Sequence, residues 1–416
     1  VTGVQTCALP IWILNWLPTS RLVVDQVLID SMPQLLRKPL AQWNFRGPVC
    51  FTGSTVVASP EEGFSSLVRD WNLKLDLEDV SLNGEMAKGI RGTIQASGEN
   101  NESGTTAVGN MALDAMSIHG VAVTGTDGPF AVSGNMLYLG RDAVEWRTRN
   151  QSNRRITSVL SSHADAPVVS AAFQSRVRDG FVEKRDEVDK GWLGPKAKPN
   201  IEIPSMDLSD NDIRTRTLSG TLFLSGIEPL NGDRSRLRLR LVDSDFRGML
   251  VDLGEAQPNV NGRLFLQCDL EGSVRNLASL SGAGRAWLRG ANLYELPVMI
   301  RLLNLLSVRP DQRAFDSADV VFGIDGDRIP ISKLELDGDL ISIQGKGEVN
   351  FRREIHLDLA TNVGRRGIIG AVVRPFTQNQ NANWMRVEVT GTTTNPQIRP
   401  PMPLRDSLDQ FLIESP

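Results

Sequence analysis

The sequence predicts a mainly β protein: a long, twisted and curled antiparallel sheet that forms a β-groove, with a few short capping helices. Three successive segments, residues 333–337, 341–349 and 355–359, alternate apolar and polar side chains with a period of two, which is typical of half-buried antiparallel strands. Turn residues separate similar segments along most of the chain, and roughly 18 to 20 strands are expected in all. An open sheet of that size is expected to curl or twist rather than stay flat.

Residues 1–11 resemble the conceptual translation of a sequencing-adapter oligonucleotide and are expected to be an artefact. They lack an initiator Met, and Gly3, Gln5 and Pro10 interrupt their apolar run, so they make a poor signal peptide. The true N-terminus is therefore expected to be missing, together with any targeting segment or membrane anchor. The rest of the sequence has no run of about 18 apolar residues, so it predicts no transmembrane helix.

Length and composition leave the number of domains open. A chain of 416 residues is long enough for one large β structure or for two to three ordinary domains. Its net charge of −4 is small for this length, which argues against a strongly basic surface for nucleic acid. Cys50 and Cys268 lie too far apart in the sequence to indicate a disulfide framework or a metal site, and both are expected to be small buried side chains in strands.

An N-terminal β-sheet region is expected over residues 12–180. Residues 71–77 alternate apolar and polar side chains, so this strand should have one buried face. The Asn83-Gly84 pair predicts a tight hairpin turn, and the Asp127-Gly128-Pro129 triplet predicts another turn. The other strands expected in this region are residues 22–29, 49–57, 89–97, 111–118, 121–124 and 130–139.

The strand pattern weakens over residues 141–175, and residues 181–200 are charged, contain two prolines and show no periodicity. The second stretch predicts a polar linker or a long loop, two alternatives that the sequence leaves open. A C-terminal β region with a short helix at 296–307 is expected over residues 201–395. The remaining residues, 396–416, form a Pro-rich tail with a short amphipathic segment.

A row of arginines occurs within this C-terminal region. Arg236, Arg238 and Arg240 alternate with leucines in an expected strand. A nucleic-acid surface would use such a row of cations, but the neighbouring Asp233 and Asp243 favour a solvated strand face. We therefore expect no nucleic-acid partner.

Residues that carry enzyme chemistry are sparse. None of His119, His163 and His356 has a Cys or a carboxylate at metal-ligand spacing, and His356 falls on the polar side of a strand. No G-x-S-x-G motif is present. The Asp-Gly-Asp triplets at 325–327 and 337–339 lack the rest of a calcium loop and predict hairpin turns. We therefore expect no enzyme activity, no metal and no cofactor.

One apolar helix is expected at residues 296–307. Pro297 suits the first helical turn, and Pro310 ends what remains of the helix. The segment is too short to span a bilayer, so it should be buried against the strands that follow it. The residues expected to cap the curled sheet are Leu296, Ile300, Leu303 and Leu306.

The expected strands have one apolar face and few helices to cover it. Such a face must pack against helices, against another sheet or against a ligand. Patterning alone favours a sandwich or solenoid core, and a groove for acyl chains, at ~0.8 kcal/mol per buried CH₂, is the other possibility. A carbohydrate-acting β-helix enzyme would show repeats of about 20 to 30 residues, and none is visible. The residues expected to line the groove are Leu334, Leu336, Ile341, Ile343, Val349, Ile355, Leu357, Leu359, Val387 and Val389.

Several motifs in the C-terminal half match one known family. They are a strand start at 279–284, a pattern of Gly, Leu and Pro at 290–307, an Ala-Phe-Asp triplet at 314–316, an Ile-x-Gly-Lys-Gly-Glu-Val segment at 343–349 and a closing strand at 386–400. Over residues 245–404 the chain resembles the C-terminal region of the AsmA family of bacterial envelope proteins.

This resemblance implies a long, curled antiparallel sheet with a hydrophobic groove, anchored in the inner membrane and facing the periplasm. Relatives in the family are thought to carry or channel phospholipids, or to affect outer-membrane assembly. The implied partners are phospholipid or another lipid, the inner membrane through the lost N-terminal anchor, and other envelope proteins. The expected function is to shield or conduct acyl chains in support of outer-membrane biogenesis, with a structural or adhesive β-sandwich protein of the envelope as the alternative.

Overall fold

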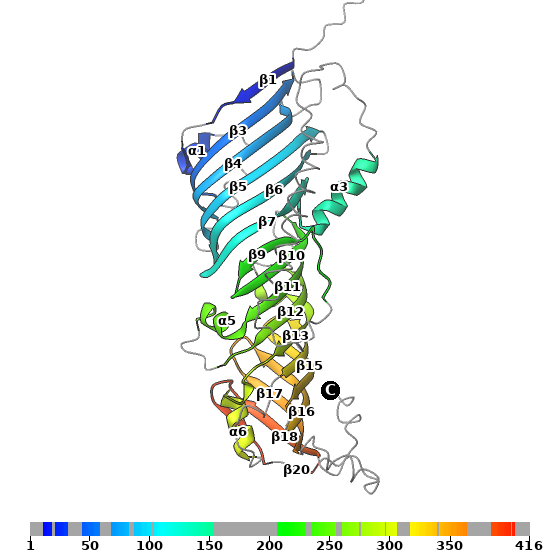
Figure 1. Ribbon diagram of the computed structural model, residues 1–416. Helices are drawn as coiled ribbons and strands as arrows, with labels where there is room; N and C mark the ends of the chain where they lie inside the picture. Colours follow the sequence, from blue (N-terminus) through cyan, green and yellow to red (C-terminus); the bar gives the residue numbers. More distant parts are fainter. Residues whose placement is uncertain are drawn as a thin grey trace, which may run out of the picture. The chain divides into compact units, whose positions relative to one another are not determined.

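The computed structural model consists of one antiparallel sheet with few helices (Figure 1). Its described part contains 20 strands, β1–β20, which antiparallel pairings join into that single sheet. The mainly β class predicted from the sequence is confirmed. The described residues are 11–18, 21–31, 44–58, 68–82, 87–101, 104–153, 206–229, 234–254, 260–273, 276–295, 297–305, 317–338, 341–363, 384–400 and 402–403.

The N-terminal strands form a meander in which each long strand pairs with the next (Figure 1). They form because apolar and polar side chains alternate, as they do over residues 71–77. Two short strands share the free edge of β3: Trp16 lies opposite Gly53 in one, and Leu22 lies opposite Val49 in the other. The strands are β1 (Ile11–Trp16), β2 (Leu22–Val24), β3 (Gly47–Ala58), β4 (Val68–Leu82), β5 (Ala87–Asn101), β6 (Gly104–Ile118), β7 (Val121–Ser133) and β8 (Met136–Leu139).

The C-terminal strands continue the meander. The turn predicted at residues 325–327 is confirmed between β14 and β15, whereas residue 339 of the second predicted turn lies outside the described residues. Two short strands cover the edge of β18, and Pro396 and Pro403 in them lack the N–H groups that further pairing would need. The strands are β9 (Ile213–Thr217), β10 (Gly220–Pro229), β11 (Ser235–Asp245), β12 (Arg263–Gly272), β13 (Ser281–Arg289), β14 (Ser317–Asp325), β15 (Arg328–Asp337), β16 (Ile341–Asn350), β17 (Ile355–Val363), β18 (Trp384–Gly391), β19 (Pro396–Ile398) and β20 (Met402–Pro403).

Four short α-helices and two 3₁₀ turns complete the described part of the chain. The strand predicted at residues 22–29 is wrong beyond Val24, because Asp25 caps a helix: its carboxylate accepts a hydrogen bond from the backbone N–H of Leu28 at 2.8 Å. Residues 141–153, where the strand pattern weakens, also form a helix. The elements are α1 (Gln26–Ser31), α3 (Arg141–Asn153), α5 (Phe246–Asp252), α6 (Pro297–Leu305), η2 (Leu277–Ser279) and η3 (Leu293–Glu295).

The turn predicted at Asp127-Gly128-Pro129 is wrong, because β7 runs straight through it. Asn110 of β6 pairs with Pro129, and the carbonyl oxygen of Pro129 accepts a hydrogen bond from the backbone N–H of Gly140 at 2.9 Å. Pairing with a neighbouring strand thus overrides the local turn preference. Strand β1 begins at Ile11, the last residue of the expected artefact. The hairpin turn predicted at residues 83–84 lies outside the described residues.

The sheet continues across a long insertion because two short strands share one place in it. Leu139 of β8 pairs with Phe130 of β7 and Gly226 of β10, and β9 pairs with the same two strands. The chain leaves the sheet after β8 and returns at β9, and residues 154–205 between them lie outside the described part of the chain. We call β8 and β9 together the split rung. It joins the N-terminal and C-terminal β regions, and the linker expected at 181–200 lies outside the described residues.

A buried ion pair closes the base of this insertion. Arg141 starts α3 and Asp212 directly precedes β9, and Nε and Nη2 of Arg141 donate hydrogen bonds to the Asp212 carboxylate at 2.9 and 2.8 Å. Nη1 of Arg141 donates a third hydrogen bond to Asp207 at 2.8 Å. The Asp212 side chain is 2% exposed, and its hydrogen bonds raise the pKa of Arg141 above the ordinary value. Because two parallel hydrogen bonds fix the geometry of such a pair, it holds the two ends of the insertion together.

The polar face of the sheet carries charged pairs between neighbouring strands. Arg240 is buried and donates hydrogen bonds to Asp269 and to the carbonyl oxygen of Cys268. The arginine row of β11 is therefore only partly solvated, whereas the sequence predicted a solvated strand face. Arg285 donates to Asp319 in the next strand, and this hydrogen bond holds the pKa of the Asp319 carboxyl below its ordinary range. Other pairs on this face are Arg236–Glu271, Arg238–Asp142 and Arg386–Asp358.

Replacing Arg141 with alanine should destabilise the protein by about 3 kcal/mol, because the buried Asp212 carboxylate loses its partner. Arg236→Ala is the matched control: Arg236 and Glu271 form an exposed pair, whose loss should cost no more than about 0.5 kcal/mol. Denaturant unfolding followed by circular dichroism measures both free energies of unfolding. Equal losses in the two variants would contradict the role of Arg141 in anchoring the insertion.

Asp319→Asn should lower the free energy of unfolding at neutral pH, because the variant loses the ion pair with Arg285. A carboxyl group whose folded-state pKa is lowered stabilises the fold above its unfolded pKa of about 4. That contribution is lost as the pH falls through the folded-state value. The difference between wild type and variant should therefore shrink between neutral pH and about pH 3. Unfolding curves at both pH values test this, and a difference that does not change with pH would speak against it.

Candidate functional site

The other face of the sheet is apolar across most of its strands. Residues that pair directly across strands lie on the same face, so the pairing register traces rows of side chains across the sheet. One such row runs from β1 to β14 through β8 of the split rung, and each of its residues is apolar or Gly. We call it the apolar row: Trp16, Gly53, Leu73, Ala96, Gly109, Phe130, Leu139, Gly226, Leu237, Leu270, Gly282 and Ile324.

Two further rows extend the apolar face from β10 to β18. They begin at Leu222 and Leu224, the residues of β10 that precede Gly226 on the same face. The first row is Leu222, Leu241, Leu266, Ala286, Val320, Leu334, Gly345, Leu359 and Val387. The second row is Leu224, Leu239, Cys268, Gly284, Phe322, Ile331, Gly347, Leu357 and Val389.

Aromatic rings lie close over glycines at three positions of this face, one of which is Gly284 beside Phe322. A Cβ atom at Gly109 would lie 2.5 Å from a ring carbon of Phe130, and one at Gly98 would lie 2.5 Å from a ring carbon of Trp71. Any larger residue at one of these glycines would displace the ring beside it. The rings therefore cover the neighbouring backbone, an arrangement that also helps to fix the register of paired strands.

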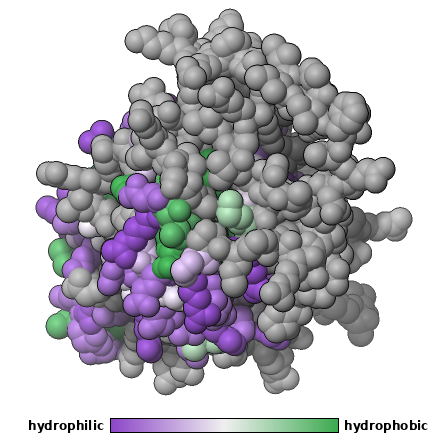
Figure 2. Space-filling model, turned by 90° about the horizontal axis from the view of Figure 1, so that it is seen from below, coloured by the Kyte–Doolittle hydropathy of each residue, from purple (hydrophilic) through white to green (hydrophobic). Residues whose placement is uncertain are grey.

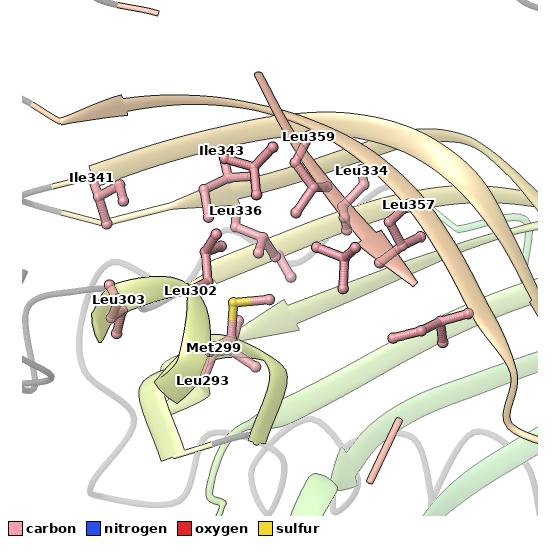
Figure 3. Packing of buried hydrophobic residues seen from close by; sticks show 14 of the residues in the cluster. Leu293, Met299, Leu302, Leu303, Leu334, Leu336, Ile341, Ile343, Leu357 and Leu359 are labelled. Atoms are coloured by element: carbon pink, nitrogen blue, oxygen red, sulfur yellow. The ribbon is translucent and has the colours of Figure 1, made fainter. Parts of the chain in front are cut away.

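The predicted groove-lining residues lie together at the C-terminal end of the apolar face, in one cluster that includes α6 (Figure 3). All of them are buried except Val349, which is half-buried. Protein side chains fill the space beside α6, so these residues offer little surface to a lipid, and a lipid-lining role for them stays a prediction. The residues are Leu334, Leu336, Ile341, Ile343, Val349, Ile355, Leu357, Leu359, Val387 and Val389.

Helix α6 packs on the sheet through a set of residues that differs from the predicted one. Met299, Leu302 and Leu303 are buried and point toward the strands, with the i, i+3, i+4 spacing of one helix face (Figure 3). Of the predicted capping residues, Leu303 lies on this face. Ile300 is 39% exposed, so its prediction is wrong: the buried face is centred on Leu302 and Leu303. The predicted capping residues outside the described part of the chain are Leu296 and Leu306.

One polar contact ties α6 to the edge of the sheet. Arg301 donates a hydrogen bond from Nη2 to Oδ1 of Asn395 at 3.0 Å and another from Nη1 to the carbonyl oxygen of Pro396. Pro396 begins β19, the short strand that covers β18. The coloured surface seen in Figure 2 is mainly hydrophilic, with few hydrophobic residues. Because Leu302 and Leu303 are fully buried in one cluster with strand residues, α6 covers the apolar face at this end.

Away from α6 the apolar row is only half-buried. Its side chains from Leu73 to Ile324 have intermediate exposure, and none belongs to the cluster around α6. Helix α1 closes a second cluster beside β2 and β3, where Ile29 is fully buried. The apolar row also lies outside this second cluster. The apolar face of the described sheet thus combines two closed cores with a stretch of partly accessible surface, and a third, smaller cluster around Phe265 and Trp287 lies on the opposite face.

The described residues do not bring together a metal-binding cluster. They contain no cluster of three or more His, Cys, Asp or Glu side chains that could hold a metal ion. His356 is exposed on the polar face, 3.9 Å from Glu388, and His163 lies outside the described ranges. Cys268 is buried as predicted, and burial raises its pKa to about 11, whereas Cys50 is half-buried; both are free thiols. None of the helices in these ranges has the length and hydrophobicity needed to cross a membrane.

Leu302→Ala should destabilise the protein by about 3 kcal/mol, because it leaves a cavity between α6 and the sheet. Leu305→Ala in the same helix is the matched control: Leu305 is 37% exposed, so its truncation should cost less than about 1 kcal/mol. Both free energies come from denaturant unfolding. If the two variants lose the same stability, α6 does not pack on the sheet in solution as it does in the structure.

No protein-family model, curated protein or solved structure matches the chain. The resemblance to the AsmA family therefore depends on the motifs in the sequence. In the structure these motifs serve packing: residues 281–284 begin β13, residues 343–349 lie in β16, and residues 386–391 lie in β18. They belong to strands that carry the apolar face, and the last two of these strands contribute to the cluster beneath α6.

Proposed function

We propose that this protein shields or conducts lipid acyl chains along the apolar face of its sheet, without catalysing a reaction. The observation that carries the proposal is the apolar row, which stays apolar in every strand that it crosses from β1 to β14. A row that served only as a core would be covered by other side chains. The side chains from Leu73 to Ile324 are instead half-buried, and accessible apolar rows of this kind commonly mark binding surfaces.

An acyl chain would gain free energy on such a surface. Burial is worth ~0.8 kcal/mol per methylene, so ten methylenes would contribute on the order of 8 kcal/mol. Neighbouring strands lie about 4.8 Å apart, so the row covers on the order of 50 Å along the sheet. That is longer than the roughly 15 Å of hydrocarbon in one leaflet of a bilayer. One lipid would therefore occupy only part of the row, which suits movement along the sheet as well as storage.

The proposal assigns the lipid to the apolar row and not to the wall predicted at residues 334–389. That wall is already filled by α6, whose Leu302 and Leu303 are fully buried. Acyl chains on the row would reach this closed end and stop there. The residues beneath α6 then act as an end wall that stabilises the sheet.

The envelope part of the proposal comes from the AsmA-like motifs. By that resemblance, the full-length protein would face the periplasm and would be anchored in the inner membrane by a segment preceding this chain. Its partners would be phospholipid or another lipid, together with other envelope proteins. Shielding acyl chains there would support outer-membrane biogenesis.

A structural or adhesive β-sandwich has less support. A sandwich needs two sheets packed face to face, whereas the described strands belong to one sheet. A carbohydrate-acting β-helix enzyme would have parallel strands, whereas the described strands pair antiparallel throughout. Neither alternative explains the half-buried apolar row.

The test compares the phospholipid bound to wild type and to two arginine variants. Ala96→Arg places a cation in the apolar row, and the matched control Gln95→Arg places the same cation on the polar face, one residue away. A cation among acyl chains costs about 3 kcal/mol, so the first variant should retain about a hundredfold less lipid. The control should retain as much as wild type. Lipid extracted from the purified full chain is measured by mass spectrometry.

Two results would overturn the proposal: a stable, monomeric wild-type protein free of lipid, or equal lipid retention by the two variants. Both substitutions add one positive charge, so a difference between them cannot come from net charge. Thermal unfolding followed by circular dichroism verifies that both variants are folded.

A further inference from the structure

A carboxylate lies on the apolar face beside the split rung. Glu228 of β10 pairs with Leu137 of β8, and Leu137 pairs with Val132 of β7, so the three residues share a face. Gly226, two residues earlier in β10, belongs to the apolar row, which puts Glu228 on the same side of the sheet. Glu228 is thus a charged residue with Leu137 beside it in β8 and Gly226 before it on the same face of β10.

The charge of Glu228 has no partner in the described part of the chain. The residue is 9% exposed, and it makes no hydrogen bond or ion pair with any described residue. A carboxylate with so little exposed surface and an apolar neighbour gains free energy from a partner of opposite charge.

A second unsatisfied polar group lies on the neighbouring strand. The pairing of β10 with β11 runs to Ile227 opposite Arg236, and the next step of the same register brings Glu228 opposite Ser235. Ser235 is 3% exposed, and its Oγ has no hydrogen-bond partner within the described residues. A carboxylate and a hydroxyl on adjacent strands are both acceptors for a donor group that carries several N–H bonds.

We propose that Glu228 and Ser235 form a binding site for the primary ammonium group of an amphiphile whose acyl chains lie on the apolar row. The site rests on the proposed function, because the acyl chains need the apolar face. A primary ammonium group has three N–H donors and a positive charge, so it satisfies both acceptors and neutralises the carboxylate. Glu228 would repel an anionic head group, and a quaternary ammonium group has no N–H to donate. The apolar surroundings strengthen the charged hydrogen bond.

The test offers the purified full chain vesicles that contain equal amounts of phosphatidylethanolamine, phosphatidylcholine and phosphatidylglycerol with identical acyl chains. Mass spectrometry of the retained lipid gives the ratio of the head groups. Wild type should enrich phosphatidylethanolamine about tenfold over each of the other lipids, the effect of one charge-assisted hydrogen bond. Glu228→Gln keeps the shape of the side chain and removes its charge, so it should abolish the enrichment.

Glu271→Gln is the matched control, because it removes one carboxylate from the polar face and should keep the wild-type ratio. Thermal unfolding should show that Glu228→Gln is at least as stable as wild type, since it removes a charge that has no partner among the described residues. Equal retention of the three lipids, equal enrichment of phosphatidylcholine and phosphatidylethanolamine, or unchanged enrichment in Glu228→Gln would each overturn the ammonium site and leave the proposed function standing. Retention of no lipid at all would overturn both.

Discussion

The pairing register of the sheet is the constraint on which the other features depend. Side chains alternate between the two faces, so a slip of one residue in any ladder would move its apolar side chains to the polar face. The ladders do contain irregularities, for example beyond Leu77 in β4 and beyond Leu241 in β11. The apolar row crosses each ladder in its regular part, at residues such as Leu73 and Leu237. The bulges therefore bend the sheet without interrupting the row.

The same constraint explains how the sheet tolerates a long insertion in the middle of a rung. β8 keeps a regular register with both neighbours, β9 does so with β10, and the Arg141–Asp212 pair brings the ends of the insertion together. Once two ends are fixed, lengthening the loop between them costs little additional entropy. The length of the insertion therefore does not change the pairing register of the strands that carry the apolar face.

Alternation with a period of two is a local signal, so the sequence predicted most strands, their turn at 325–327 and the mainly β class. Local signals failed where distant contacts decide: β7 stays extended through Asp127–Pro129 because β6 pairs with it. The helix at α1 had a readable signal in Asp25, an N-cap residue directly before the apolar run. Glu228 could not be found from the sequence, because only the register across the split rung puts it among apolar side chains.

The apolar face of the sheet is covered to different degrees in its two parts. Under α6 the rows are filled by helix side chains, whereas along the apolar row they stay half-buried. A bare apolar row favours aggregation, so under the proposed function a lipid on the row would also stabilise the protein. Glu228 lies on this face next to the row, in β10, the strand that directly follows the split rung. An acyl chain that moves along the row would pass a charge without a partner among the described residues, which raises the free-energy barrier to its movement. A lipid with a cationic head group would neutralise this charge and lower the barrier. Selection of the head group would therefore take place within the row and not where the lipid first binds.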